Sequence, residues 1–191
     1  MLRTFTASRA QGVLRRFSAA LTGIGLAASL SASIGVIAPL ASFAPRVAHA
    51  EVAFAPADAI QSFEGHFFNL LNEDRVNNGL APLEYDPGFS SVARWRSDDM
   101  ATRGYFSHDI GGYQVFQVIK DQGIAYRVAG ENLAYNYHGA DQTVPAAERA
   151  LMQSPSHREN ILRADYTHAG VGIAVTPDGK FLYTQLFKKS W

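Results

Sequence analysis

The 191-residue sequence contains no cysteine, which excludes a disulfide framework, a thiolate zinc site and a cysteine nucleophile. It also lacks a G-x-S-x-G elbow, a phosphate-binding glycine loop and an H-E-x-x-H helix, so the common signatures of serine hydrolases, nucleotide-binding proteins and zinc proteases are missing. Basic residues are scarce after residue 50, where 12 Lys and Arg stand against 17 Asp and Glu, a formal charge of −5. We therefore expect no nucleic-acid partner.

Charge of either sign is missing from residues 17–45, a segment rich in Leu, Ile, Ala, Ser and Gly. Four arginines precede this segment, and the small-residue pattern Ala48-His49-Ala50 follows it. A positive start, an apolar middle and an A-x-A exit are typical of a secretory signal. We predict that residues 1–50 are a signal peptide cleaved near Ala50, with an uncleaved N-terminal membrane anchor as the alternative. Both readings place the rest of the chain outside the cytoplasm, secreted or in the cell envelope.

After a short lead-in over residues 51–61, the pattern changes from helical to extended along a single domain, residues 62–191. The spacing of apolar residues and the Gly and Pro boundaries predict helices over 63–77, 87–103, 114–122 and 144–152, and a further helix that starts at Ser154-Pro155. Asp86 is the expected N-cap of the second helix, and Gly104 is expected to end it. Residues 169–187 predict a β-hairpin around Pro177-Asp178-Gly179, and residues 129–135 predict another strand. Helices separated from a small antiparallel sheet define the α+β class.

One charged residue lies on the apolar stripe of the second predicted helix. Phe89, Val92, Ala93 and Met100 make up this stripe, and Arg96 falls among them.

Three separate segments carry residues suited to chemistry. His157 would be the third residue of the helix that starts at Pro155, where the positive end of the helix dipole favours a neutral imidazole. His108 follows the second helix in a segment rich in glycine, and Glu131 lies in the strand predicted over 129–135. A neutral imidazole binds metal or accepts a proton, whereas a buried Glu needs a partner. Each residue also has a purely structural interpretation. His157 would form hydrogen bonds within a buried turn, His108 would lie in a surface loop, and Glu131 would be a strand residue whose hydrogen bonds are satisfied.

The order of the motifs resembles the bacterial branch of the CAP superfamily, also called SCP-like. The motifs are Phe106-Ser107-His108, Gly130-Glu131-Asn132, Ser154-Pro155-Ser156-His157-Arg158 and Tyr183-Thr184-Gln185-Leu186-Phe187. The superfamily includes cysteine-rich secretory proteins, insect venom antigens and plant pathogenesis-related proteins. The resemblance implies a three-layer α-β-α sandwich with a small antiparallel sheet and a central cavity.

The resemblance also implies a site. Many members hold two His and two acidic residues in the cavity, and several take up a divalent ion. Carried over by motif, His108, Glu131 and His157 are the candidate catalytic and metal-binding residues, with zinc as the expected metal. The same motifs supply four supporting residues: Asn132, Ser154, Asn160 and Gln185. Ser154 stands where many relatives have the second acid. Glu148 is expected to be a solvent-facing helix charge, with compensation for the missing acid as the alternative.

Three functions remain open at this point. The first is an exported domain that binds a lipid-like or cell-envelope ligand in its cleft, with or without a metal ion. The second is a metal-assisted extracellular hydrolase that uses His108, Glu131 and His157, and the third is a surface interaction module without catalysis. Membrane contact is expected only through an uncleaved N-terminal segment.

Overall fold

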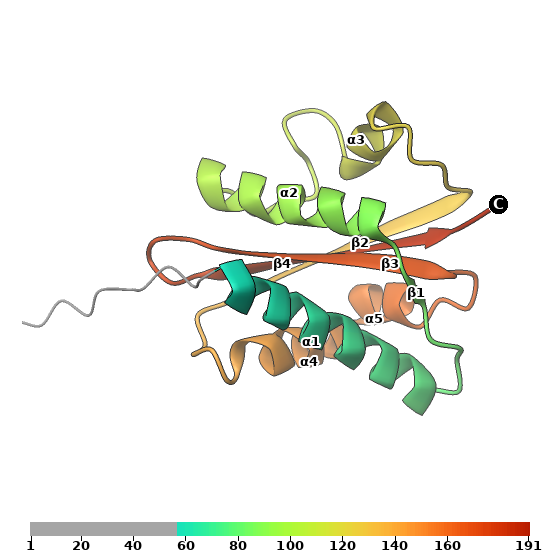
Figure 1. The fold of residues 1–191 in the computed structure, drawn as a ribbon, viewed down its shortest axis with the longest axis horizontal. Helices are drawn as coiled ribbons and strands as arrows, with labels where there is room; N and C mark the ends of the chain where they lie inside the picture. Colours follow the sequence, from blue (N-terminus) through green and yellow to red (C-terminus); the bar gives the residue numbers. More distant parts are fainter. Residues whose placement is uncertain (1–56) are drawn as a thin grey trace, which may run out of the picture. The chain divides into compact units, whose positions relative to one another are not determined.

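Helices cover both faces of a central sheet in the computed structural model, which describes residues 57–191 (Figure 1). One helical layer contains α2 (Pro87–Arg103) and α3 (Val115–Asp121), and the other contains α1 (Ala57–Asn77), α4 (Thr143–Gln153) and α5 (Pro155–Ile161). The strands are β1 (Glu84–Tyr85), β2 (Val128–Asn136), β3 (His168–Val175) and β4 (Phe181–Lys189). The predicted three-layer α-β-α sandwich is confirmed. The predicted signal segment, residues 1–50, lies outside the described residues.

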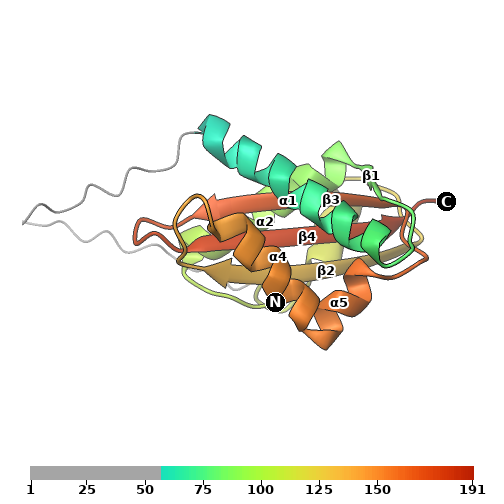
Figure 2. The same cartoon turned by 90° about the horizontal axis from the view of Figure 1, so that it is seen from below.

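The strands form one mixed sheet in the order β1-β3-β4-β2. Strands β3 and β4 pair antiparallel as the predicted hairpin, and β2 pairs antiparallel with the other edge of β4. The two-residue strand β1 runs parallel to β3, a pairing that the sequence did not indicate because so short a strand has no periodicity. Figure 2 shows α1, α4 and α5 crossing one face of this sheet. In the described part of the chain, no helix combines the length and apolar character needed to span a bilayer.

The ends of α2 and α5 decide where the functional loops begin. The side chain of Asp86 accepts a hydrogen bond from the backbone N–H of Phe89 at 2.8 Å, which caps α2 as predicted. Gly104 ends this helix with φ of 69°, a conformation that glycine adopts without steric cost. Helix α5 begins at Pro155, also as predicted, although the side chain of Ser154 makes no capping hydrogen bond. His108 therefore lies in the loop after α2, and His157 lies in the first turn of α5.

Close packing on both faces of the sheet creates the core. Phe67, Leu71 and Leu151 are buried between the sheet and the layer of α1, α4 and α5. Phe89 of α2 and Ile119 of α3 are buried on the opposite side of the sheet. Because the interior is filled on both faces, positions on β2 and β4 are fixed relative to the helices on either side.

Candidate functional site

Arg96 connects helix α2 to the loop that carries His108. Its side chain is fully buried and lies against the ring of Tyr105, with the guanidinium carbon 5.3 Å from the ring centroid. The guanidinium donates to the Tyr105 hydroxyl at 2.7 Å and to the backbone carbonyl of Ser107. The Tyr105 hydroxyl in turn donates to Asp99. The residue immediately before His108 is thus held by a buried cation.

Glu131 joins this cation to the first histidine. Arg96 Nε donates to Glu131 Oε1 at 3.0 Å, and His108 Nδ1 lies 2.6 Å from Glu131 Oε2. The Glu131 side chain is buried, whereas that of His108 is about half exposed, at 52%. The Glu131 carboxylate therefore has the partners that its burial requires. It also orients the imidazole of His108, whose other ring nitrogen points away from the carboxylate.

His157 comes to the same site from α5. Burial lowers the pKa of His157 below its usual range, and the nearby His108 lowers it further, since two imidazolium charges repel. At neutral pH this imidazole is therefore uncharged, in the direction that the helix position predicted. The structure brings His108, Glu131 and His157 together from a loop, a strand and a helix that are far apart in the sequence.

Three amide side chains attach α5 to the sheet. Asn132 Nδ2 donates to the backbone carbonyl of His157 and to Gln185 Oε1, both at 3.0 Å. Asn160 Nδ2 donates to Asn132 Oδ1 at 2.9 Å. Asn132, Asn160 and Gln185 thus connect β2 and β4 to α5, and their supporting role in a site stays a prediction. Ser154 lies beside the site, but its hydroxyl has only a long, 3.5 Å contact with that of Ser156.

A groove of about 230 Å³ opens next to His157. Its lining is mostly apolar and comes from the loop after α2, from β2, and from α4 and α5: Phe106, Leu133, Ala134, Tyr135, Ala150, Leu151, Ser154 and His157. The rings of Phe106 and Tyr135 meet edge to face with centroids 4.9 Å apart, and both are substantially exposed. Exposed aromatic rings around an apolar hollow are typical of a binding surface.

The expectation that Glu148 is a solvent-facing charge was wrong. Glu148 is buried, at 3% exposure, because its side of α4 faces the sheet. Its Oε2 accepts a hydrogen bond of 2.7 Å from Gln185 Nε2, and its Oε1 is buried without a hydrogen-bond partner among the described residues. Glu148 is therefore part of the amide network and not a second acid beside the two imidazoles.

The side chains as they stand do not make a three-ligand metal centre. Both oxygens of Glu131 already contact Arg96 or His108. Within residues 57–191, no group of three His, Asp or Glu side chains is placed to hold a metal ion. The two imidazoles are the donors that suit zinc, with Glu131 orienting one of them, an arrangement frequent in zinc sites. Zinc stays a prediction, and metal analysis of the purified protein would decide it.

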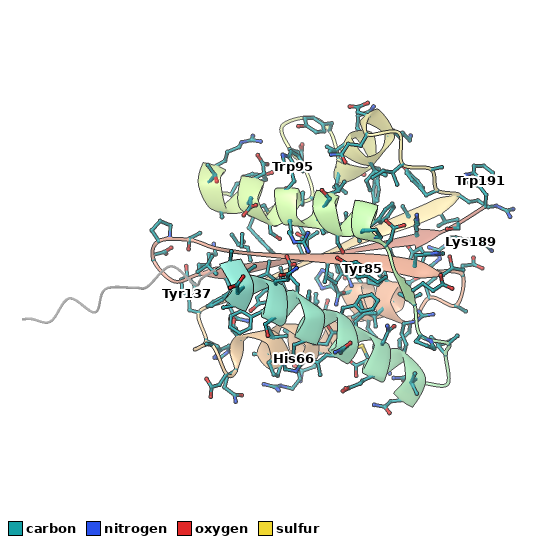
Figure 3. All side chains as sticks on the ribbon, viewed as in Figure 1. His66, Tyr85, Trp95, Tyr137, Lys189 and Trp191 are labelled. Atoms are coloured by element: carbon teal, nitrogen blue, oxygen red, sulfur yellow. The ribbon has the colours of Figure 1, made fainter. Side chains whose placement is uncertain are left out.

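Sequence reasoning missed the roles of Arg96 and Tyr105 in holding the loop of His108, and it missed the contact between Phe106 and Tyr135. Arg96 had a usable signal, because a charged residue on an otherwise apolar helix stripe must find a buried partner. Tyr105 and the Phe106–Tyr135 contact had none, since a long-range contact leaves no local pattern. His66 is exposed and projects from α1 (Figure 3), and His138 is exposed in the loop after β2, so neither belongs to the site.

The fold and the converged motifs define an SCP-like α-β-α domain. Residues 68–187 match the model of the cysteine-rich secretory protein family, named CAP. The chain therefore belongs to the CAP family, although it contains none of the cysteines in that description.

Two Bacillus subtilis proteins and one solved Bacillus anthracis structure illustrate the likeness. The chain is 40% identical over 129 residues to the uncharacterized membrane protein YlbC of Bacillus subtilis, covering 67% of this chain and 35% of YlbC. It is 35% identical over 130 residues to the uncharacterized protein YkwD of the same organism, covering 68% of this chain and 48% of YkwD. The chain thus spans less than half the length of either protein. A solved structure of an extracellular SCP-domain protein from Bacillus anthracis is 28% identical with a TM-score of 0.61, covering 68% of this chain and 41% of that one.

Proposed function

We propose that this chain is an extracytoplasmic CAP-domain protein whose groove beside His157 binds the apolar part of a lipid-like cell-envelope ligand. The observation that carries the proposal is the groove itself, which is lined by apolar side chains apart from Ser154 and His157. The N-terminal signal pattern supports a location outside the cytoplasm. The likeness to a protein described as extracellular supports the same location.

The size of the groove limits what it holds. About 230 Å³ is smaller than the roughly 300–1,000 Å³ of pockets that enclose a whole drug-sized ligand. It therefore accommodates one apolar segment, such as part of an acyl chain. The remainder of the ligand would lie over the exposed rings of Phe106 and Tyr135.

The polar end of such a ligand has suitable partners nearby. His108 is half exposed and oriented by Glu131, and His157 is kept neutral by burial and by His108. The imidazole of His108, oriented by Glu131, and the neutral imidazole of His157, which lines the groove, offer hydrogen bonds to a hydroxyl or carboxyl headgroup. An amphipathic ligand is thus matched at both ends.

Filling the groove from an exposed position tests the proposal without disturbing the core. Ala150 is an exposed residue of α4 that lines the groove, so Ala150→Phe places a ring in the space that the acyl segment would occupy. Titration of the purified protein with a fluorescent fatty acid should show saturable binding, weakened at least tenfold in this variant.

Gln153→Phe is the matched control. It adds the same ring to another exposed position of α4 that does not line the groove, so the affinity should be unchanged. Absence of saturable binding by the unmodified protein, or equal loss in both variants, would overturn the proposal.

A further inference from the structure

We propose that Glu148 is a positioning residue for this groove: as a neutral acid it anchors, through Gln185 and Asn132, the helix that carries His157. The inference rests on the proposed function for its significance. The arrangement that supports it is a continuous chain of buried side chains running from α4, through β4 and β2, to α5.

The chain of hydrogen bonds has a fixed direction. Gln185 Nε2 donates to Glu148 Oε2 at 2.7 Å, while Gln185 Oε1 accepts from Asn132 Nδ2 at 3.0 Å. Asn132 Nδ2 also donates to the backbone carbonyl of His157. Because an amide has a donating end and an accepting end, the acceptor at Glu148 decides which way the Gln185 amide points. In that orientation, Gln185 Oε1 faces Asn132 and accepts the hydrogen bond from its Nδ2.

The same anchor also holds one wall of the groove. Leu151 follows Glu148 by three residues on α4, lines the groove and is buried. Residues three apart lie on the same side of a helix. Attachment of Glu148 to β4 therefore fixes the distance between the α4 wall of the groove and β2, which supplies Leu133 and Tyr135.

The surroundings of Glu148 favour its protonated form. Its Oε1 is buried and has no hydrogen-bond partner among the described residues, so an ionised carboxylate would leave charge on an unsolvated oxygen. Burial, followed by the negative charge of Asp74 on α1, raises the pKa of Glu148 to about 8. At neutral pH the group is therefore mostly the uncharged acid.

Within residues 57–191 no cation compensates this carboxyl. From α1, Asp74 faces it, and the neighbouring buried Arg75 donates instead to the backbone carbonyls of Ala81, Ile161 and Arg163. From β4 its partner is the uncharged Gln185, and β2 and α5 connect to it through uncharged amides. Ionisation would therefore place two carboxylates side by side between α1 and α4.

An NMR titration of the ligand-free mature protein from pH 6 to pH 10 tests the inference. The side-chain amide signals of Gln185 and Asn132 and the backbone amide of His157 should move together, with a midpoint near pH 8. In Glu148→Gln, which keeps an uncharged acceptor for Gln185, this movement should be absent and the neutral-pH positions retained. Glu159→Gln removes an exposed carboxylate from α5 and is the control, so it should titrate as the unmodified protein does.

The outcomes separate this inference from the proposed function because no ligand is present. Glu148→Leu, which removes the acceptor, should shift the three signals at every pH. A midpoint below pH 7, persistence of the transition in Glu148→Gln, or unshifted signals in a folded Glu148→Leu protein would overturn the inference. A carboxyl that stays protonated up to pH 10 would support it, provided that Glu148→Leu moves the signals. Failure of fatty-acid binding would refute only the proposed ligand. The role of Glu148 established by the NMR titration would not be affected.

Discussion

Arg96 shows how one buried charge organises the site. It lies on the apolar stripe of α2, yet it is completely buried because Glu131, Tyr105 and the Ser107 carbonyl together satisfy its guanidinium. A buried ion pair contributes little net stability relative to a well-packed apolar pair, but loss of one partner leaves an uncompensated charge. The Arg96–Glu131 pair matters here for the geometry of the site, because Arg96 fixes the carboxylate that orients His108.

Replacement of Arg96 by Met should therefore lower the free energy of unfolding by about 3–5 kcal/mol, measured by chemical denaturation. Arg103→Met removes the surface pair with Asp99, where the arginine side chain is 51% exposed, and a cation–π contact with Tyr105, and it should cost about 1 kcal/mol or less. The double variant Arg96→Met with Glu131→Gln should recover part of the loss because it removes the stranded charge. Equal effects of the two arginine substitutions would show that Arg96 is not electrostatically coupled to Glu131.

Helix α2 approaches strand β3 closely because two residues of the strand have no side chain. A Cβ atom on Gly170 would overlap the backbone of Phe89 and Ser90, and one on Gly172 would overlap that of Ala93 and Arg94. The alternation of Gly with Val171 and Ile173 thus gives β3 one flat face for the helix and one apolar face for the core. The position of α2 sets that of Arg96, so this contact reaches the site.

Gly172→Ala should destabilise the protein by about 1–3 kcal/mol, because the added methyl group meets helix backbone that cannot rotate away. Gly65→Ala on α1 is the matched comparison, since a Cβ atom added to Gly65 meets nothing within 4 Å. It should stabilise the protein by about 0.5–1 kcal/mol through helix propensity. Thermal or urea unfolding of both variants checks the opposite signs, and a stabilised Gly172→Ala protein would refute the close contact.

The stability of the whole molecule should depend on pH because of Glu148. Its pKa is about 8 in the folded protein against an ordinary value of 4.5, so the folded state binds the proton more tightly. Stability from this group is then fully present below about pH 4.5, is lost as pH rises to about 8, and is constant above that.

Comparison with Glu148→Gln isolates this contribution. The free energy of unfolding of the unmodified protein, relative to that of the variant, should fall by roughly 3–5 kcal/mol between pH 5 and pH 9. Glu159→Gln, which alters an exposed carboxylate, should show no such pH-dependent difference from the unmodified protein. A constant difference across this range for Glu148→Gln would mean that the buried carboxyl does not titrate abnormally.

Features with a local cause could be predicted closely. The Asp86 cap, the Gly104 terminus and the Pro155 start were all visible, because each depends on neighbouring residues and backbone geometry. The convergence of His108, Glu131 and His157 came from resemblance to the family and not from any local pattern. Glu148 was misjudged because its helix position alone does not reveal which side of α4 faces the sheet.

The α+β class, most element boundaries and the motif residues could be predicted from the sequence, because they follow from periodicity, capping and residue type over short distances. Three contacts became visible only in the folded chain: Arg96 holds Glu131, Gln185 and Asn132 connect Glu148 to α5, and Phe106 meets Tyr135 at the groove. The physical reason is that burial and pairing of polar groups depend on contacts between distant segments. Such contacts exist only after the two helical layers have closed on the sheet.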